Sequence, residues 1–241
     1  MLKTYGASYL CRYRKNIMLM EDNEKDIIML GVMHRDKSGY KLLLERLKQF
    51  TPEIITLEFS HYGLNYRQIM GKTYKKRIMD VILKNSGNRS KLNREALSDL
   101  ISFVNMPYEY KAALRYTKQH SGSLHLIDLD IFSYAKLQKS EEMFSVSNLE
   151  RLLFNGEGFK KYDERAVARL FFEGGIKVYK YTEEMYIRDR YMSGRISMIK
   201  GDNKNKRLLH ICGWQHLDDP YRFYAPLNPR KVFIYDKTVC I

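Results

Sequence analysis

Short apolar runs alternate with amphipathic stretches in the first part of the chain. Residues 27–30 form a continuous apolar run ended by Gly31, and residues 53–58 contain a second run. Between them, residues 38–50 carry leucines among charged side chains, and the pair Thr51-Pro52 follows. Short apolar runs are typical of buried strands, and the spaced leucines predict an amphipathic helix that proline ends. The pattern therefore predicts a right-handed strand–helix–strand unit with parallel strands.

Further strands and helices are predicted along the rest of the chain. Strands are expected over residues 124–128, 208–212 and 231–235, with an edge strand over residues 5–13. A long helix with Thr182 as its N-terminal cap is expected over residues 182–199. Helical spacing also occurs in residues 66–84, 93–104, 107–120 and, in pieces broken near Gly156 and Gly158, 133–172.

Strands separated by helices predict an α/β fold. We expect a central mixed, largely parallel sheet flanked by helices. Residues 1–241 are interpreted as one domain, with a helical subdomain inserted at about 61–121, between the second and third core strands.

Composition narrows the class of protein. A hydrophobic content of 44% with 13% aromatic residues excludes a disordered chain. No apolar run approaches the roughly 20 residues of a membrane span, and basic residues between positions 12 and 15 interrupt any secretory segment. The three cysteines are isolated, so they predict neither disulfides nor a metal knuckle. These features predict a cytoplasmic protein with no membrane span.

The chain is strongly basic, with 42 Lys and Arg against 28 Asp and Glu and a formal charge of +14. Such a charge attracts polyanions, but recognition of nucleic acid needs basic residues gathered on one surface. Here they are spread over residues 72–77, 160–161 and 200–207, and no zinc-finger, KH or RRM signature occurs. The charge therefore favours a lysine-rich solvated surface over a nucleic-acid partner.

Polar side chains follow the ends of four predicted strands. His34 follows the first strand, Glu58 the second, Asp128 the third and His216 the fourth. Ligands of open α/β sheets bind at the carboxyl edge, so parallel strands would bring these side chains to one rim. Both histidines stand in a Gly-x-x-His pattern, in which the glycine is expected to let the backbone turn sharply off the sheet.

Two imidazoles and a carboxylate from separate strands predict a divalent metal site. His34, Glu58 and His216 would supply three ligands and leave a coordination position for a reactive water. Zn, Mn or Co suits this donor set. The alternative is that each histidine is a hydrogen-bonded residue of the rim.

Arg188, on the predicted helix 182–199, is a further candidate. If it faces the core it needs an anionic partner, because an uncompensated buried charge is costly. The pattern by itself favours a surface ladder of Glu184, Arg188 and Arg195.

These motifs resemble the TraB/PrgY/Tiki superfamily in their order. Residues 31–34 and 213–216 match its two Gly-x-x-His motifs, and residues 52–58 match the strand that ends in its glutamate. Residues 126–131 and 188–192 are similar to its aspartate-containing segment and to its late arginine segment.

The resemblance implies the fold of erythromycin esterases and ChaN-like haem-uptake proteins, with the site at the rim. It also implies a metal-dependent hydrolase, as proposed for the Tiki metalloproteases. Leu129 and Ile187 differ from the family's usual residues, and the membrane helices that end some TraB relatives are absent.

We therefore expect a hydrolase acting on a peptide or a small amide or ester. His34, Glu58 and His216 would bind the ion, which activates water. Glu58 is alternatively the general base, while Arg188 would stabilise the oxyanion and Asp128 would orient a ligand. The resemblance leaves open a metal-free mechanism in which His34 and Glu58 act as an acid–base pair.

Three further expectations remain open. A non-catalytic regulatory or signalling protein of the same fold would bind an acidic partner through residues 72–77 of the basic insertion. His61 is the substitute ligand if one of the three is misassigned. Trp214 either walls the pocket or packs in the core. The sequence does not indicate the oligomeric state.

Overall fold

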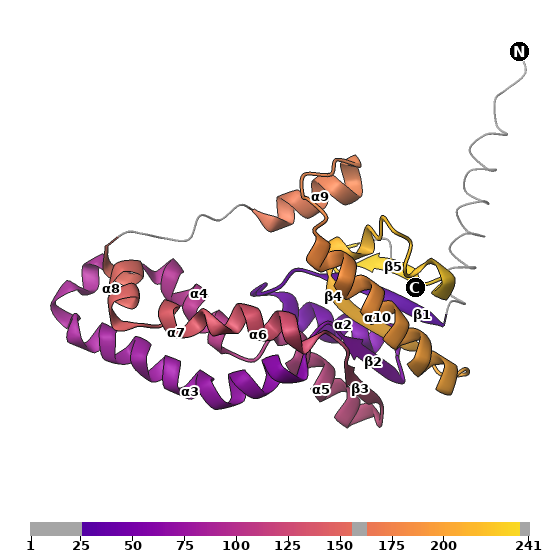
Figure 1. Ribbon diagram of the computed structural model, residues 1–241, viewed down its shortest axis with the longest axis horizontal. Helices are drawn as coiled ribbons and strands as arrows, with labels where there is room; N and C mark the ends of the chain where they lie inside the picture. Colours follow the sequence, from indigo (N-terminus) through magenta and orange to yellow (C-terminus); the bar gives the residue numbers. More distant parts are fainter. Residues whose placement is uncertain (1–25, 156–162, 237–241) are drawn as a thin grey trace, which may run out of the picture.

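The computed structural model describes residues 26–155 and 163–236 (Figure 1). The edge strand expected over residues 5–13 and the break near Gly156 and Gly158 lie outside these residues. No helix of the described ranges is long and apolar enough to cross a membrane.

A five-stranded sheet with the order β3-β2-β4-β1-β5 forms the centre of the fold. The α/β class is confirmed, and every pairing among the described strands is parallel, so the sheet is not mixed there. Leu208 of the central strand β4 stands opposite Ile27 on one side and Ile54 on the other. All five carboxyl ends therefore meet at one edge. The strands are β1 (Ile27–Val32), β2 (Ile54–Leu57), β3 (Ser123–Leu126), β4 (Leu208–Gly213) and β5 (Arg230–Phe233).

Helices cover both faces of the sheet, which explains the continuous apolar runs. Alternate residues of β1 enter different cores: Leu30 packs in one, and Met29 in the other. The Leu30 face is covered by α2 (Gly39–Phe50) and α5 (Tyr108–His120), and the Met29 face by α10 (Glu183–Asp202).

A second group of helices extends away from the sheet and has its own core (Figure 1). Tyr74 and Phe144 stack at its centre with ring centroids 4.3 Å apart. We call this group the helical lobe. It contains α3 (His61–Lys84), η1 (Ser86–Lys91), α4 (Arg94–Val104), α6 (Asp130–Gln138), α7 (Ser140–Met143) and α8 (Val146–Phe154).

The lobe differs from the insertion expected at about 61–121. Helix α5 falls within that range, yet it packs on the sheet beside α2 through Ala112, Ala113 and Tyr116. Helices α6, α7 and α8 follow β3 in the chain and pack with the lobe instead. Helical spacing reveals an apolar face but not its partner, so the sequence alone did not separate these helices.

Capping residues set the limits of the two helices that bear on the site. Helix α3 begins at His61, five residues earlier than predicted, because the Ser60 hydroxyl accepts the Gly63 N–H. Thr182 accepts the Met185 N–H and caps α10, as the sequence predicted. The remaining helical elements are α9 (Glu164–Gly174), η2 (Trp214–Leu217) and η3 (Ala225–Leu227).

Removing the aromatic centre of the helical lobe is expected to be destabilising. Phe144 is fully buried against Tyr74, so Phe144→Ala should lower the free energy of unfolding by about 3–5 kcal/mol. Urea denaturation followed by circular dichroism measures this loss. Met79→Ala on the exposed side of α3 is the control and should change stability by less than about 0.5 kcal/mol. Equal effects of the two changes would contradict a packed lobe core.

Candidate functional site

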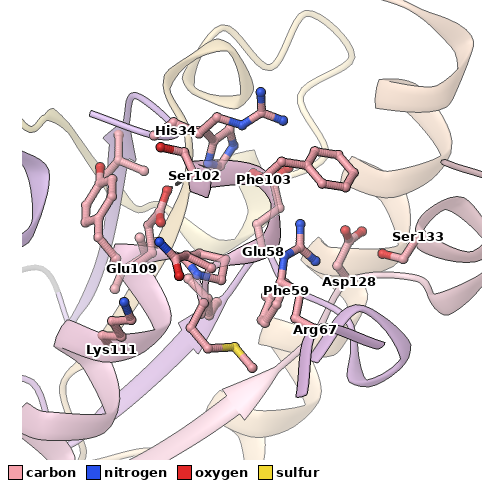
Figure 2. Close-up of a pocket in the computed structure, with 18 of the residues that line it drawn as sticks. His34, Glu58, Phe59, Arg67, Ser102, Phe103, Glu109, Lys111, Asp128 and Ser133 are labelled. Atoms are coloured by element: carbon pink, nitrogen blue, oxygen red, sulfur yellow. Dashed lines mark hydrogen bonds and ion pairs between the residues drawn. The ribbon is translucent and has the colours of Figure 1, made fainter. Parts of the chain in front are cut away.

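A pocket of about 460 Å³ lies at the carboxyl edge of the sheet, facing the helical lobe (Figure 2). Its sheet side is formed by side chains that follow three strands and by Arg188 from α10. His34 comes after β1, Glu58 directly after β2 and Asp128 after β3. The opposite wall comes from four helices and includes Arg67, Phe103, Glu109, Lys111 and Ser133.

The buried carboxylate of Glu58 is the centre of this edge. Its Oε2 accepts the backbone N–H of Gly213 at 2.6 Å, and its Oε1 accepts from His216 Nε2 at 3.1 Å and from Arg188. Burial by itself would raise the pKa of Glu58, but the positive charges of His216 and Arg188 hold it well below its usual value. Glu58 is therefore ionised, and each of its oxygens accepts from at least one protein donor.

His216 lies behind Glu58 and is held between two carboxylates. Its Nδ1 donates to Asp189 at 2.5 Å, and Asp189 also accepts from the hydroxyls of Tyr224 and Tyr181. Burial would lower the pKa of His216, but Glu58 and Asp189 raise it to about 10. The ring is therefore an imidazolium whose two N–H groups both donate.

Arg188 joins Glu58 to Asp128. Its Nε and Nη2 donate to the two oxygens of Asp128 at 2.9 and 2.8 Å, and Nη2 also donates to Glu58. Burial would lower its pKa, but these carboxylates raise it. The surface ladder is thus wrong for Arg188: the side chain is only 12% exposed, and Glu184 is a distant third partner at 3.4 Å. It faces the core because it has the anionic partners that burial requires.

His34 is the open member of the group. Its Nδ1 is 2.8 Å from Oε1 of Glu109, a buried carboxylate at the start of α5, and about half of the His34 side chain (51%) is exposed. Partial burial would lower the pKa of His34, but the hydrogen bond to Glu109 and its charge raise it. Glu109 keeps a proton on Nδ1, so in the neutral ring the lone pair lies on Nε2. In the described part of the chain Nε2 has no hydrogen-bond partner.

The two motif glycines are needed for space rather than for a special backbone angle. Gly213 has φ −56°, and neither glycine has a positive φ. A Cβ at position 213 would come within 3.0 Å of His34 Nε2 and 3.5 Å of Glu58 Oε2. A Cβ at position 31 would come within 2.6 Å of Leu217. The expectation that these glycines allow a sharp turn is therefore wrong. They let β1, β4 and η2 approach closely.

The structure thus brings together all five residues predicted from the sequence. Four of them line the pocket, and His216 supports Glu58 from behind. Sequence reasoning missed Asp189, although it stands beside Arg188 in the segment that carried the resemblance. It also missed Glu109, for which the sequence offers no signal, because the contact with His34 spans 75 positions.

The two remaining expectations near the motifs have different outcomes. His61 is exposed at the start of α3 and is not among the pocket residues. Trp214 is buried, packs edge-on against Tyr179 and donates Nε1 to Glu164 at 3.1 Å. Of the two interpretations of Trp214, core packing is therefore the one observed.

The expected metal ligands do not fit a divalent ion in this arrangement. A metal needs deprotonated ligands with free lone pairs, whereas His216 donates both of its N–H groups and both oxygens of Glu58 accept from protein donors. Among the described residues, no group of three or more His, Cys, Asp or Glu side chains is placed to hold a metal. Coordination by His34, Glu58 and His216 stays a prediction that requires rearrangement.

Comparisons of the chain with protein-family models, curated proteins and solved structures found no match. The resemblance to the TraB/PrgY/Tiki superfamily therefore stays a prediction, based on the motifs alone.

The raised pKa of His216 predicts a pH-dependent stability. Because the folded pKa, about 10, exceeds the unfolded value near 6.5, the native state binds the additional proton between these pH values. This contribution is complete below pH 6.5 and is lost as pH rises toward 10, with a slope of up to about 1.4 kcal/mol per pH unit.

Urea denaturation at pH 6.5, 7.5 and 8.5 tests this contribution in His216→Gln. The difference in unfolding free energy between the wild type and this variant should shrink as pH rises. His61→Gln, which makes the same change at an exposed position, is the control and should follow the wild-type slope. A difference independent of pH for His216→Gln would show that the ring is neutral.

Proposed function

We propose that this protein is a hydrolase that cleaves an ester or amide bond of a peptide or small molecule in the pocket, with His34 as general base. One observation carries the proposal. A half-exposed imidazole at the strand ends has its Nδ1 held by buried Glu109, and its Nε2 has no partner among residues 26–155 and 163–236. This combination fixes the tautomer of a catalytic base and leaves the basic nitrogen for a water molecule.

The reaction requires a single proton shuttle. His34 Nε2 takes a proton from water while the water oxygen bonds to the substrate carbonyl carbon. The C–O or C–N bond then breaks, and the leaving group takes the proton from His34. Glu109 keeps the ring oriented and stabilises the transient imidazolium, as a carboxylate does beside the base of a hydrolytic triad.

Arg188 is the group that we assign to the developing negative charge. It lines the pocket, and within the described residues its Nη1 makes only the 3.4 Å contact with Glu184. Glu58 and Asp128 fix the remaining nitrogens, so the guanidinium needs little reorganisation during the reaction. In this proposal Glu58 and Asp128 position Arg188, and no step is assigned to a metal ion.

The binding of an acidic partner through residues 72–77 has no comparable support. Arg77 of this segment already pairs with Glu141, and Tyr74 is buried in the lobe core. We therefore retain that alternative only as an outcome of the following experiment.

Replacement of His34 tests the assignment of the base. His34→Ala should lower the hydrolysis rate about 10²–10⁴-fold on the best substrate in a panel of nitrophenyl esters and aminoacyl nitroanilides. His61→Ala is the matched control and should retain full activity, since His61 lies outside the pocket lining. Wild-type activity should rise with pH through the raised pKa of His34, because only the neutral ring accepts a proton.

Two results would contradict the proposal. One is equal activity of His34→Ala and the wild type. The other is a protein that turns over nothing in the panel but binds an acidic protein through residues 72–77, which would favour the non-catalytic alternative.

Removal of metal distinguishes a metal-free hydrolase from a metal-dependent one. Because Glu58 and His216 already bind each other, dialysis against EDTA should leave the hydrolysis rate within about twofold of the untreated protein. Loss of activity that Zn, Mn or Co restores would instead support the site expected from His34, Glu58 and His216.

A further inference from the structure

Basic side chains outnumber acidic ones in the wall of the pocket. Among the basic residues, Arg188 forms ion pairs with Glu58 and Asp128, and Lys136 pairs with Glu184 at 2.6 Å. The other basic lining residues have no acidic partner in the described ranges: Arg35, Lys37, Arg67 and Lys111.

The acidic residues of the wall are already engaged. Glu109 interacts with His34, and Asp36 accepts from the hydroxyl of Tyr235. Glu58 and Asp128 are held by Arg188, as described above. With six Lys and Arg side chains in the lining against four Asp and Glu, the open space keeps an excess of positive charge, which attracts anions.

Arg67 is the most firmly positioned of these cations. Its guanidinium carbon lies 5.4 Å from the ring centroid of Phe59 and 5.9 Å from that of Phe103. Nη1 donates to the Gly63 carbonyl at 3.2 Å, while Nε is buried and has no partner in the described chain. Two aromatic rings, labelled with Arg67 in Figure 2, and the Gly63 carbonyl thus hold the group, and donors remain for a ligand.

The surroundings of Arg67 also disfavour its positive charge. Burial, followed by the nearby charge of Arg35, lowers the pKa of Arg67, and the charge of Glu109 offsets only part of this. An arginine remains protonated at neutral pH despite such a shift. An anion bound beside it would relieve both effects, since it supplies hydrogen-bond acceptors and the opposite charge.

We propose that the ligand of this pocket carries a carboxylate or phosphate group and that Arg67 is its principal contact. The planar fork of a guanidinium binds two oxygens of either group at once. Arg35 and Lys111, which line the same space, add attraction from the pocket wall. The inference rests on the proposed function in so far as this ligand is the substrate of the hydrolase.

Binding is measured without turnover by NMR titration of the isotope-labelled full chain. One pair of probes is N-acetylglycine and its neutral amide, and the other is glycerol 3-phosphate and glycerol. We expect at least one anion to bind tenfold or more tightly than its neutral partner. The pair that shows the larger difference in affinity between anion and neutral probe tells whether the ligand carries a carboxylate or a phosphate.

Matched substitutions assign the preference to Arg67. Arg67→Gln should weaken binding of the preferred anion about tenfold and leave binding of the neutral probe unchanged. Lys72→Gln removes one charge from the exposed surface of the same helix and should have no effect. Arg67→Lys keeps the charge without the fork and should bind with intermediate affinity, which provides a second test if the glutamine variant does not fold.

The outcomes separate this inference from the proposed function. Equal affinity for anions and neutral probes, or equal losses in Arg67→Gln and Lys72→Gln, would overturn the inference. His34→Ala should keep the anion preference, because Arg67 is a binding residue and not the base. A protein that binds anions but hydrolyses none of the panel would contradict only the proposed function.

Discussion

The buried carboxylate of Glu58 is the interaction on which the candidate site depends. It joins the end of β2 to β4 through Gly213, to η2 through His216 and to α10 through Arg188. An ionised carboxylate removed from water loses several kcal/mol of hydration free energy, which is recovered only with well-placed opposite charges and donors. Here two cations and a backbone N–H provide them, so the strand ends, η2 and α10 are held in one arrangement.

The charged groups at this edge of the sheet fall into a part that is shielded from solvent and a part that is open to it. His216, Asp189 and Glu58 form a chain of ionic hydrogen bonds that has little contact with solvent. His34 stands beside these residues but is held by Glu109 of α5, and its second nitrogen has no partner in the part of the chain that the structure describes. The shielded part supplies rigidity, and the open part supplies a group that can exchange protons.

Protonation, rather than residue type, decides between a metal site and an ionic cluster. Two histidines and a glutamate are suitable metal ligands when the imidazoles are neutral. Asp189 and Glu58 instead favour the imidazolium form of His216, and Arg188 supplies a fixed positive charge close to Glu58. The helical lobe adds Arg67 on the opposite wall, a cation with no acidic partner among the described residues.

The α/β class, the five strands of the sheet and the meeting of His34, Glu58, Asp128 and His216 were predictable from the sequence. Apolar periodicity reports burial, and parallel strands end at one edge. The division of the helices between sheet and lobe was not predictable, since the apolar face of a helix does not indicate which element packs against it. The same is true of the pairing of His34 with Glu109 and of Arg67 with two aromatic rings. Such contacts join positions far apart in the chain, so only the tertiary structure decided which charges are neutralised, which histidine is protonated and which groups remain free to act.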